Sequence, residues 1–135
     1  MNDNNYYLKK STAVLREVKK SVIGKDDVIC KVYMAIIAGG HVLLDDIPGV
    51  GKTTMAQAFA NALGLEYNRI QFTPDVMPSD ITGFSMYNRQ TGQFEFKHGA
   101  TMCNVLLADE INRTSPKTQS ALLQIMEEYK VTVDG

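Results

Sequence analysis

The glycine-rich segment Pro48-Gly49-Val50-Gly51-Lys52-Thr53-Thr54 constrains the fold of this chain more than any other feature. An apolar run from His41 to Asp45 precedes it, and a stretch with helical spacing of apolar residues follows from Lys52 to Leu63. A run that short, bounded by glycines and a Pro-Gly turn, predicts a buried strand. Strand, glycine-rich loop and helix in this order are typical of a phosphate-binding loop.

The residue types in this segment suit a polyphosphate. Glycines let the backbone curl, so that amides of about Gly49 to Thr54 would point at phosphate oxygens, helped by the helix dipole. Lys52 would reach the β and γ phosphates, and the Thr53 hydroxyl would take one coordination place on Mg²⁺. Asp46 stands where the GxxxxGK[ST] pattern expects glycine, although aspartate also tolerates turn conformations. A turn that binds nothing is the alternative interpretation.

A second segment, Val105-Leu106-Leu107-Ala108-Asp109-Glu110, is an apolar strand that ends in two carboxylates. Alone it indicates little, because exposed strand ends are often acidic. After a phosphate-binding loop it supplies the missing half of a magnesium–nucleotide site, since parallel strands bring their carboxyl ends to one edge of a sheet. Asp109 would hold the magnesium, and Glu110 would polarise the attacking water. Lys52, Asp109 and Glu110 are therefore the candidate catalytic residues.

The remaining pattern predicts an α/β protein with a parallel sheet. Strands are expected over Tyr67 to Phe72 and Asn104 to Asp109, and a hairpin whose arms are Phe84 to Tyr87 and Phe94 to Phe96. Further helices are expected from Leu8 to about Val22, from Asp26 to Ile36 and after Ser115-Pro116, and a last strand over Val131 to Val133.

Composition excludes several classes of function. Fourteen basic and fifteen acidic side chains leave a net charge of -1, so there is no field to attract nucleic acid or a membrane surface. A polar N-terminus without an apolar run of membrane-spanning length makes a cytoplasmic protein the expectation. The four residues Cys30, His41, His98 and Cys103 lack the paired spacing of a zinc site.

The segments HVLLDDIPGVGKTT, RIQFTPDVMPSDITG, FEFKHG, LLADEINRTSPKTQSALLQIMEE and VTVDG resemble successive motifs of the MoxR ATPases, from about residue 22 onward. The resemblance implies the AAA+ type of P-loop NTPase fold, a three-layer sandwich, with hydrolysis of Mg²⁺-ATP and self-association into a ring. It also implies a chaperone-like role in maturing protein complexes or inserting metal cofactors, with a von Willebrand factor A domain protein as the suggested client.

The resemblance also suggests roles for single residues. Val22, Ile23 and Gly24 match the family segment near the adenine, with an ordinary helix connector as the alternative. Asn112 and Arg113 match a run that serves subunit contacts or nucleotide sensing, and a solvated loop is equally consistent. Thr73 would be a polar switch for Glu110.

Against the family pattern, residues 1–135 correspond to part of a AAA+ domain, with an N-terminal helix over 1–22 and a hairpin-containing insert over 73–99. We expect the family's fourth core strand, sensor residues, arginine finger and lid to lie beyond Gly135, so the chain alone would be a poor catalyst. The absent strand would separate 41–45 from 104–109, which predicts a rearranged sheet, a swapped strand or an assembly. A catalytically silent, nucleotide-dependent scaffold is the alternative function, whereas the Asp109-Glu110 pair disfavours a small-molecule kinase.

Overall fold

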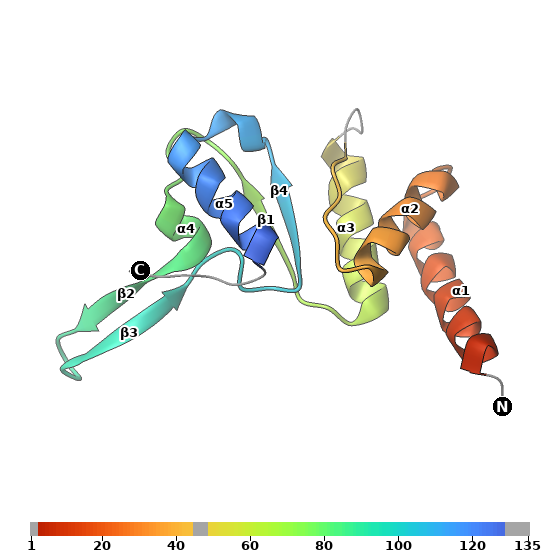
Figure 1. The fold of residues 1–135 in the computed structure, drawn as a ribbon, viewed down its shortest axis with the longest axis horizontal. Helices are drawn as coiled ribbons and strands as arrows, with labels where there is room; N and C mark the ends of the chain where they lie inside the picture. Colours follow the sequence, from red (N-terminus) through yellow and green to blue (C-terminus); the bar gives the residue numbers. More distant parts are fainter. Residues whose placement is uncertain (1–2, 45–48, 129–135) are drawn as a thin grey trace. The chain divides into compact units, whose positions relative to one another are not determined.

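A computed structural model describes residues 3–44 and 49–128 (Figure 1). The chain divides into two compact units, residues 1–67 and residues 68–135. Each unit has a hydrophobic core of its own. In the described ranges no helix combines the length and the apolar character that crossing a bilayer requires.

The described part of the first unit contains three helices: α1 (Asp3–Ser21), α2 (Asp26–Ile37) and α3 (Gly49–Leu63). Their apolar faces meet in a core that contains Val18, Val22, Ile29, Val32, Met55 and Phe59. Tyr33 of α2 lies parallel to the Phe59 ring of α3 at 6.2 Å between centroids, and its hydroxyl donates to Ser11 Oγ of α1 at 3.0 Å. The helical periodicity of the sequence therefore identifies the faces that pack.

The start of α2 and the end of α3 lie where the sequence predicts them. Asp26 and Asp27 lie in the first turn of α2, where negative charge meets the positive end of the helix dipole. Gly64 directly follows α3 with a φ of 66°, a left-handed conformation that glycine adopts without the steric cost of a Cβ atom.

The strand predicted over His41 to Asp45 is wrong for the residues that the structure describes. Residues 41–44 have no regular structure, and Leu43 is 86% exposed. A strand persists only where its backbone groups pair with a neighbouring strand. The sheets of the described residues consist of β1 with β4 and β2 with β3, and residues 41–44 belong to neither.

The second unit packs helices on a small parallel sheet made of β1 (Tyr67–Gln71) and β4 (Val105–Asp109), as Figure 1 shows. Both strands lie where the sequence predicts them. The core joins Phe72, just after β1, to Ile81 and to Leu122 of α5 (Pro116–Glu128). Ser115 precedes α5, and its Oγ accepts the backbone N–H of Thr118 at 3.3 Å, which confirms the predicted helix cap.

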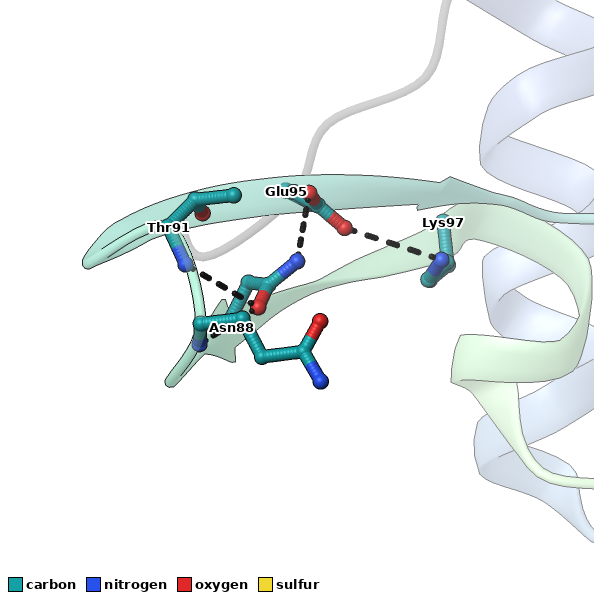
Figure 2. A network of polar contacts seen from close by, with 5 residues as sticks. Asn88, Thr91, Glu95 and Lys97 are labelled. Carbon is teal, nitrogen blue, oxygen red and sulfur yellow. Dashed lines mark hydrogen bonds and ion pairs between the residues drawn. The ribbon is translucent and has the colours of Figure 1, made fainter.

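The predicted hairpin is present as β2 (Gly83–Asn88) and β3 (Gln93–His98), paired antiparallel from Gly83 with His98 to Asn88 with Gln93. Asn88 organises the turn (Figure 2): its Oδ1 accepts the backbone N–H groups of Gln90 and Thr91, and its Nδ2 donates to Glu95 at 2.8 Å. Asparagine stabilises turns by such local hydrogen bonds.

A short helix, α4 (Pro78–Thr82), was not predicted, because the turn formers around it mask its start. Asp80 stabilises that start, since its carboxylate accepts the backbone N–H of Met77 at 2.8 Å. Gly99 follows β3 so close to α4 that a Cβ atom there would overlap the carbonyl of Ile81. Both ends of the hairpin therefore lie beside α4.

Candidate functional site

The predicted phosphate-binding residues from Gly49 to Thr54 are the first six residues of α3. The helix begins at Gly49, whereas the sequence predicted a loop as far as Gly51 and a helix from Lys52. The earlier start is compatible with Pro48 preceding it in the sequence, since proline is favoured at helix starts. First-turn amides have no carbonyl acceptor within their own helix. The donors expected to meet phosphate are thus supplied by a helix start; Pro48 and Asp46 lie outside the described residues.

Lys52 ends the first turn of α3 and Thr53 begins the second, and both side chains are half-buried. The helix dipole adds positive potential to the Lys52 ammonium at this end. Met55 and Phe59, farther along α3, are buried in the core of the first unit and hold the helix in place. The core thus supports the helix end that carries Lys52 and Thr53.

Asp109 and Glu110 lie at the carboxyl end of β4, as predicted. The N–H of Phe72, just after β1, donates to the carbonyl of Asp109 at 2.8 Å, which ties the ends of the two strands together. The Asp109 side chain is only 15% exposed, whereas Glu110 is exposed. The two neighbouring carboxylates therefore have different surroundings.

Glu110 has a left-handed backbone conformation, with φ at 57° and ψ at 44°. It is the one non-glycine residue with positive φ in the described ranges, and this conformation costs a residue with a Cβ atom about 1–2 kcal/mol. A 3-10 helix, η1 (Ile111–Arg113), follows at once, with Ile111 packed against the core and Arg113 N–H donating to the Glu110 carbonyl at 3.0 Å. These contacts hold the turn that carries Glu110.

Arg69 of β1 joins the site, and the sequence reasoning missed it. Its Nη2 lies 3.1 Å from Oδ2 of Asp109. No local pattern could indicate a pair that is 40 positions apart in the chain. Pairing Tyr67 to Phe72 with the strand that ends in Asp109 could have suggested Arg69, as a polar residue in a strand beside the carboxylate.

A group of hydroxyls fixes the segment that follows Glu110. The side chains of Thr114 and Thr118, both buried, donate to the same acceptor, the carbonyl of Val76, at 3.3 and 2.9 Å. Gln119 Nε2 donates to the carbonyl of Thr114 at 3.1 Å. These hydrogen bonds attach the start of α5 to the loop after β1. Glu110 and η1 lie between β4 and this attached part of the chain.

The other residues that the resemblance suggested have varied positions. Val22 is 7% exposed in the core of the first unit, Ile23 is 86% exposed, and Gly24 has a φ of 79°. Adenine contact by these residues stays a prediction. Thr73 Oγ1 accepts the N–H of Asp75 at 3.3 Å within its own turn, so its role as a switch also stays a prediction.

Asn112 and Arg113 are exposed in η1. Their suggested part in subunit contacts or nucleotide sensing remains a prediction.

The donor groups fit magnesium. Each unit offers an oxygen ligand of the kind that Mg²⁺ prefers, the Thr53 hydroxyl in the first unit and the Asp109 carboxylate in the second. The Asp109 carboxylate already pairs with a cation, the guanidinium of Arg69. Within the described residues no group of three or more His, Cys, Asp or Glu side chains could hold a metal ion. Mg²⁺ commonly binds through one or two carboxylates, water and substrate phosphates, so it needs no such group.

Comparison with known proteins places these features in a family. Residues 41–135 match the model of the ATPase family associated with various cellular activities (AAA). The chain belongs to this family. Within it, the MoxR branch is indicated by Chaperone MoxR1 of Mycobacterium tuberculosis, 43% identical over 88% of this chain and 32% of the relative.

Two further proteins are similar to this chain of the AAA family. The uncharacterized protein YeaC of Bacillus subtilis is 55% identical over 90% of the chain and 38% of its own length. The crystal structure of a "putative ATPase" from Cytophaga hutchinsonii superimposes with a TM-score of 0.83 at 45% identity, covering 94% of this chain and 38% of that one. The AAA chain thus spans under two fifths of these relatives, and the family match includes Lys52, Asp109 and Glu110 but begins after Gly24.

Proposed function

We propose that this chain supplies the magnesium–ATP site of a MoxR-type motor that hydrolyses ATP. The observation that carries the proposal is the Asp109-Glu110 pair at the carboxyl end of β4, in a chain whose α3 begins with Gly49-Val50-Gly51-Lys52-Thr53. Membership of the AAA ATPase family supports the same nucleotide chemistry.

In this proposal each residue has a distinct task. The first-turn amides of α3, from Gly49 to Lys52, and the Lys52 ammonium would bind the phosphates. The Thr53 hydroxyl and the Asp109 carboxylate would hold Mg²⁺, which supplies charge neutralisation when bound. Glu110 would orient a water molecule and accept its proton as the oxygen attacks the γ phosphate and the bond from that phosphate to ADP breaks. The exposure of Glu110 suits contact with water.

The biological role is proposed from the relatives. One of them is named a chaperone, which supports a chaperone-like role in maturing protein complexes or inserting metal cofactors. Ring self-association and a von Willebrand factor A domain client follow from the same resemblance. A neighbouring subunit in such a ring would supply the arginine that this kind of hydrolysis uses.

The test compares Glu110→Gln with Lys52→Ala in the full-length protein, measuring binding of a fluorescent ATP analogue and release of phosphate. Glu110→Gln should bind nucleotide within about twofold of the wild type and lose about 10²- to 10⁴-fold in turnover, because it removes a general base only. Lys52→Ala should weaken binding itself. Glu127→Gln, on the exposed face of α5, is the matched control and should change neither.

Two outcomes would contradict the proposal. Unchanged turnover in Glu110→Gln would remove the role given to Glu110. A wild-type protein that binds magnesium–ATP but never hydrolyses it would favour the scaffold function instead.

A further inference from the structure

The ion pair between Arg69 and Asp109 places a positive charge of the protein on the carboxylate that the proposed function assigns to magnesium. Arg69 Nη2 lies 3.1 Å from Asp109 Oδ2, within hydrogen-bonding distance. The Asp109 side chain is 15% exposed and that of Arg69 is 42% exposed. The carboxylate is thus mostly shielded from water, whereas the arginine has open solvent beside it.

The pair depends on the alignment of two neighbouring strands. Phe72 N–H donates to the Asp109 carbonyl at 2.8 Å, which fixes the end of β4 against the end of β1. On the Arg69 side, Asn68 Oδ1 accepts the Arg69 N–H at 2.9 Å, and Asn68 Nδ2 donates to the Ala100 carbonyl at 3.0 Å. The backbones of both partners are therefore anchored, and the flexible part of the pair is the long Arg69 side chain.

Arg69 and a magnesium ion would make conflicting demands on this carboxylate. Mg²⁺ requires near-octahedral geometry with oxygen ligands at about 2.0–2.1 Å and keeps several of its waters. A guanidinium on the same carboxylate occupies one oxygen and adds a positive charge within a few ångströms, which repels a second cation. The guanidinium and the metal therefore compete for the negative charge of one carboxylate, and magnesium binds more weakly while the arginine stays in place.

We propose that Arg69 is a displaceable counter-ion of Asp109, which occupies the carboxylate in the metal-free protein and competes with magnesium for it. The inference rests on the proposed function, in which Asp109 holds the metal. Because Arg69 is the more exposed partner, it can turn toward solvent when it is displaced. Arg69 then sets the magnesium concentration at which the site fills, without contacting the reacting atoms itself.

The experiment measures affinity of the full-length protein for mant-ATP at increasing concentrations of MgCl₂, and also without divalent metal. In Arg69→Gln the magnesium concentration for half-maximal tightening should fall by about three- to fivefold, the factor expected for loss of a partly exposed ion pair. Affinity for mant-ATP without metal should not change. Arg69→Lys keeps a competing charge and should stay close to the wild type.

Arg89→Gln is the matched control, because it removes the same charge from an exposed turn of the same unit and should leave the midpoint unchanged. A midpoint that rises or stays constant in Arg69→Gln overturns the competition, although magnesium-dependent binding by the wild type would still support the proposed function. An equal loss of affinity with and without metal would show that Arg69 is structural, which also overturns it. If the wild type binds no magnesium–nucleotide at all, both proposals fail.

Discussion

Replacing Thr118 by valine tests how the start of α5 is attached to the loop after β1. Thr118 is fully buried, and its hydroxyl lies 2.9 Å from the Val76 carbonyl and 3.1 Å from Ser115 Oγ. Valine has nearly the same shape, so the change removes the hydroxyl with little change in volume. The Val76 carbonyl retains the Thr114 hydroxyl at 3.3 Å, and the Ser115 cap of the helix remains.

The free-energy cost of Thr118→Val follows from the hydrogen bonds that remain after the hydroxyl is removed. No buried polar group loses every partner, so the loss is close to that of a single buried hydrogen bond, about 1–2 kcal/mol. Free energies of that size change an opening equilibrium by about five- to thirtyfold. Thr118→Val should therefore lower the protection of α5 amides against hydrogen exchange by a factor in this range.

Native-state hydrogen exchange suits the full-length protein, because local opening can be measured without assuming two-state unfolding. Thr12→Val on α1 is the control: its hydroxyl is exposed and bonds only the carbonyl of Leu8 in its own helix, so protection should change by less than about twofold. Protection of α5 within twofold of the wild type in Thr118→Val would show that the Thr118 hydroxyl does not attach the start of α5 to the loop after β1.

Two further substitutions test the hairpin and its junction. Gly99→Ala should destabilise the second unit by about 2 kcal/mol or more, because the added Cβ would overlap backbone atoms of Ile81 and Gly83. Backbone atoms cannot move aside as the end of a side chain can. Thermal unfolding measures the effect, and an unchanged melting temperature would contradict it. Asn88→Ala should destabilise the β2–β3 turn by about 1 kcal/mol, because it removes the oxygen that accepts the backbone N–H groups of Gln90 and Thr91. Hydrogen exchange of these two amides measures the effect. Unaltered exchange rates would show that the turn does not need the side chain.

Much of the fold could be predicted because its determinants are local. The spacing of Val18 and Val22, the Ser115-Pro116 cap and the turn between Asn88 and Gln93 each specify structure within a few residues. The strand at His41 failed because strand formation depends on a partner, and a short apolar run does not contain that information. Short helix α4 was hidden by the same turn-forming residues that begin it.

The candidate site was predictable to a similar extent. Lys52, Asp109 and Glu110 were identified because a phosphate-binding loop and an acidic strand end have sequence patterns of their own. Arg69 has no such pattern, since its role depends on which strand lies beside β4. The left-handed backbone of Glu110 also could not be inferred, because glutamate is not a residue that normally indicates positive φ.

That conformation of Glu110 has an evolutionary consequence. At position 110 the backbone favours glycine, then asparagine and aspartate, whereas the chemistry assigned to the side chain requires a longer carboxylate. In related sequences whose ATP hydrolysis is no longer under selection, position 110 should change first to one of these smaller residues. The change relieves the backbone strain, whereas turnover is lost. Retention of glutamate at this turn across a lineage would therefore be a record of continued use.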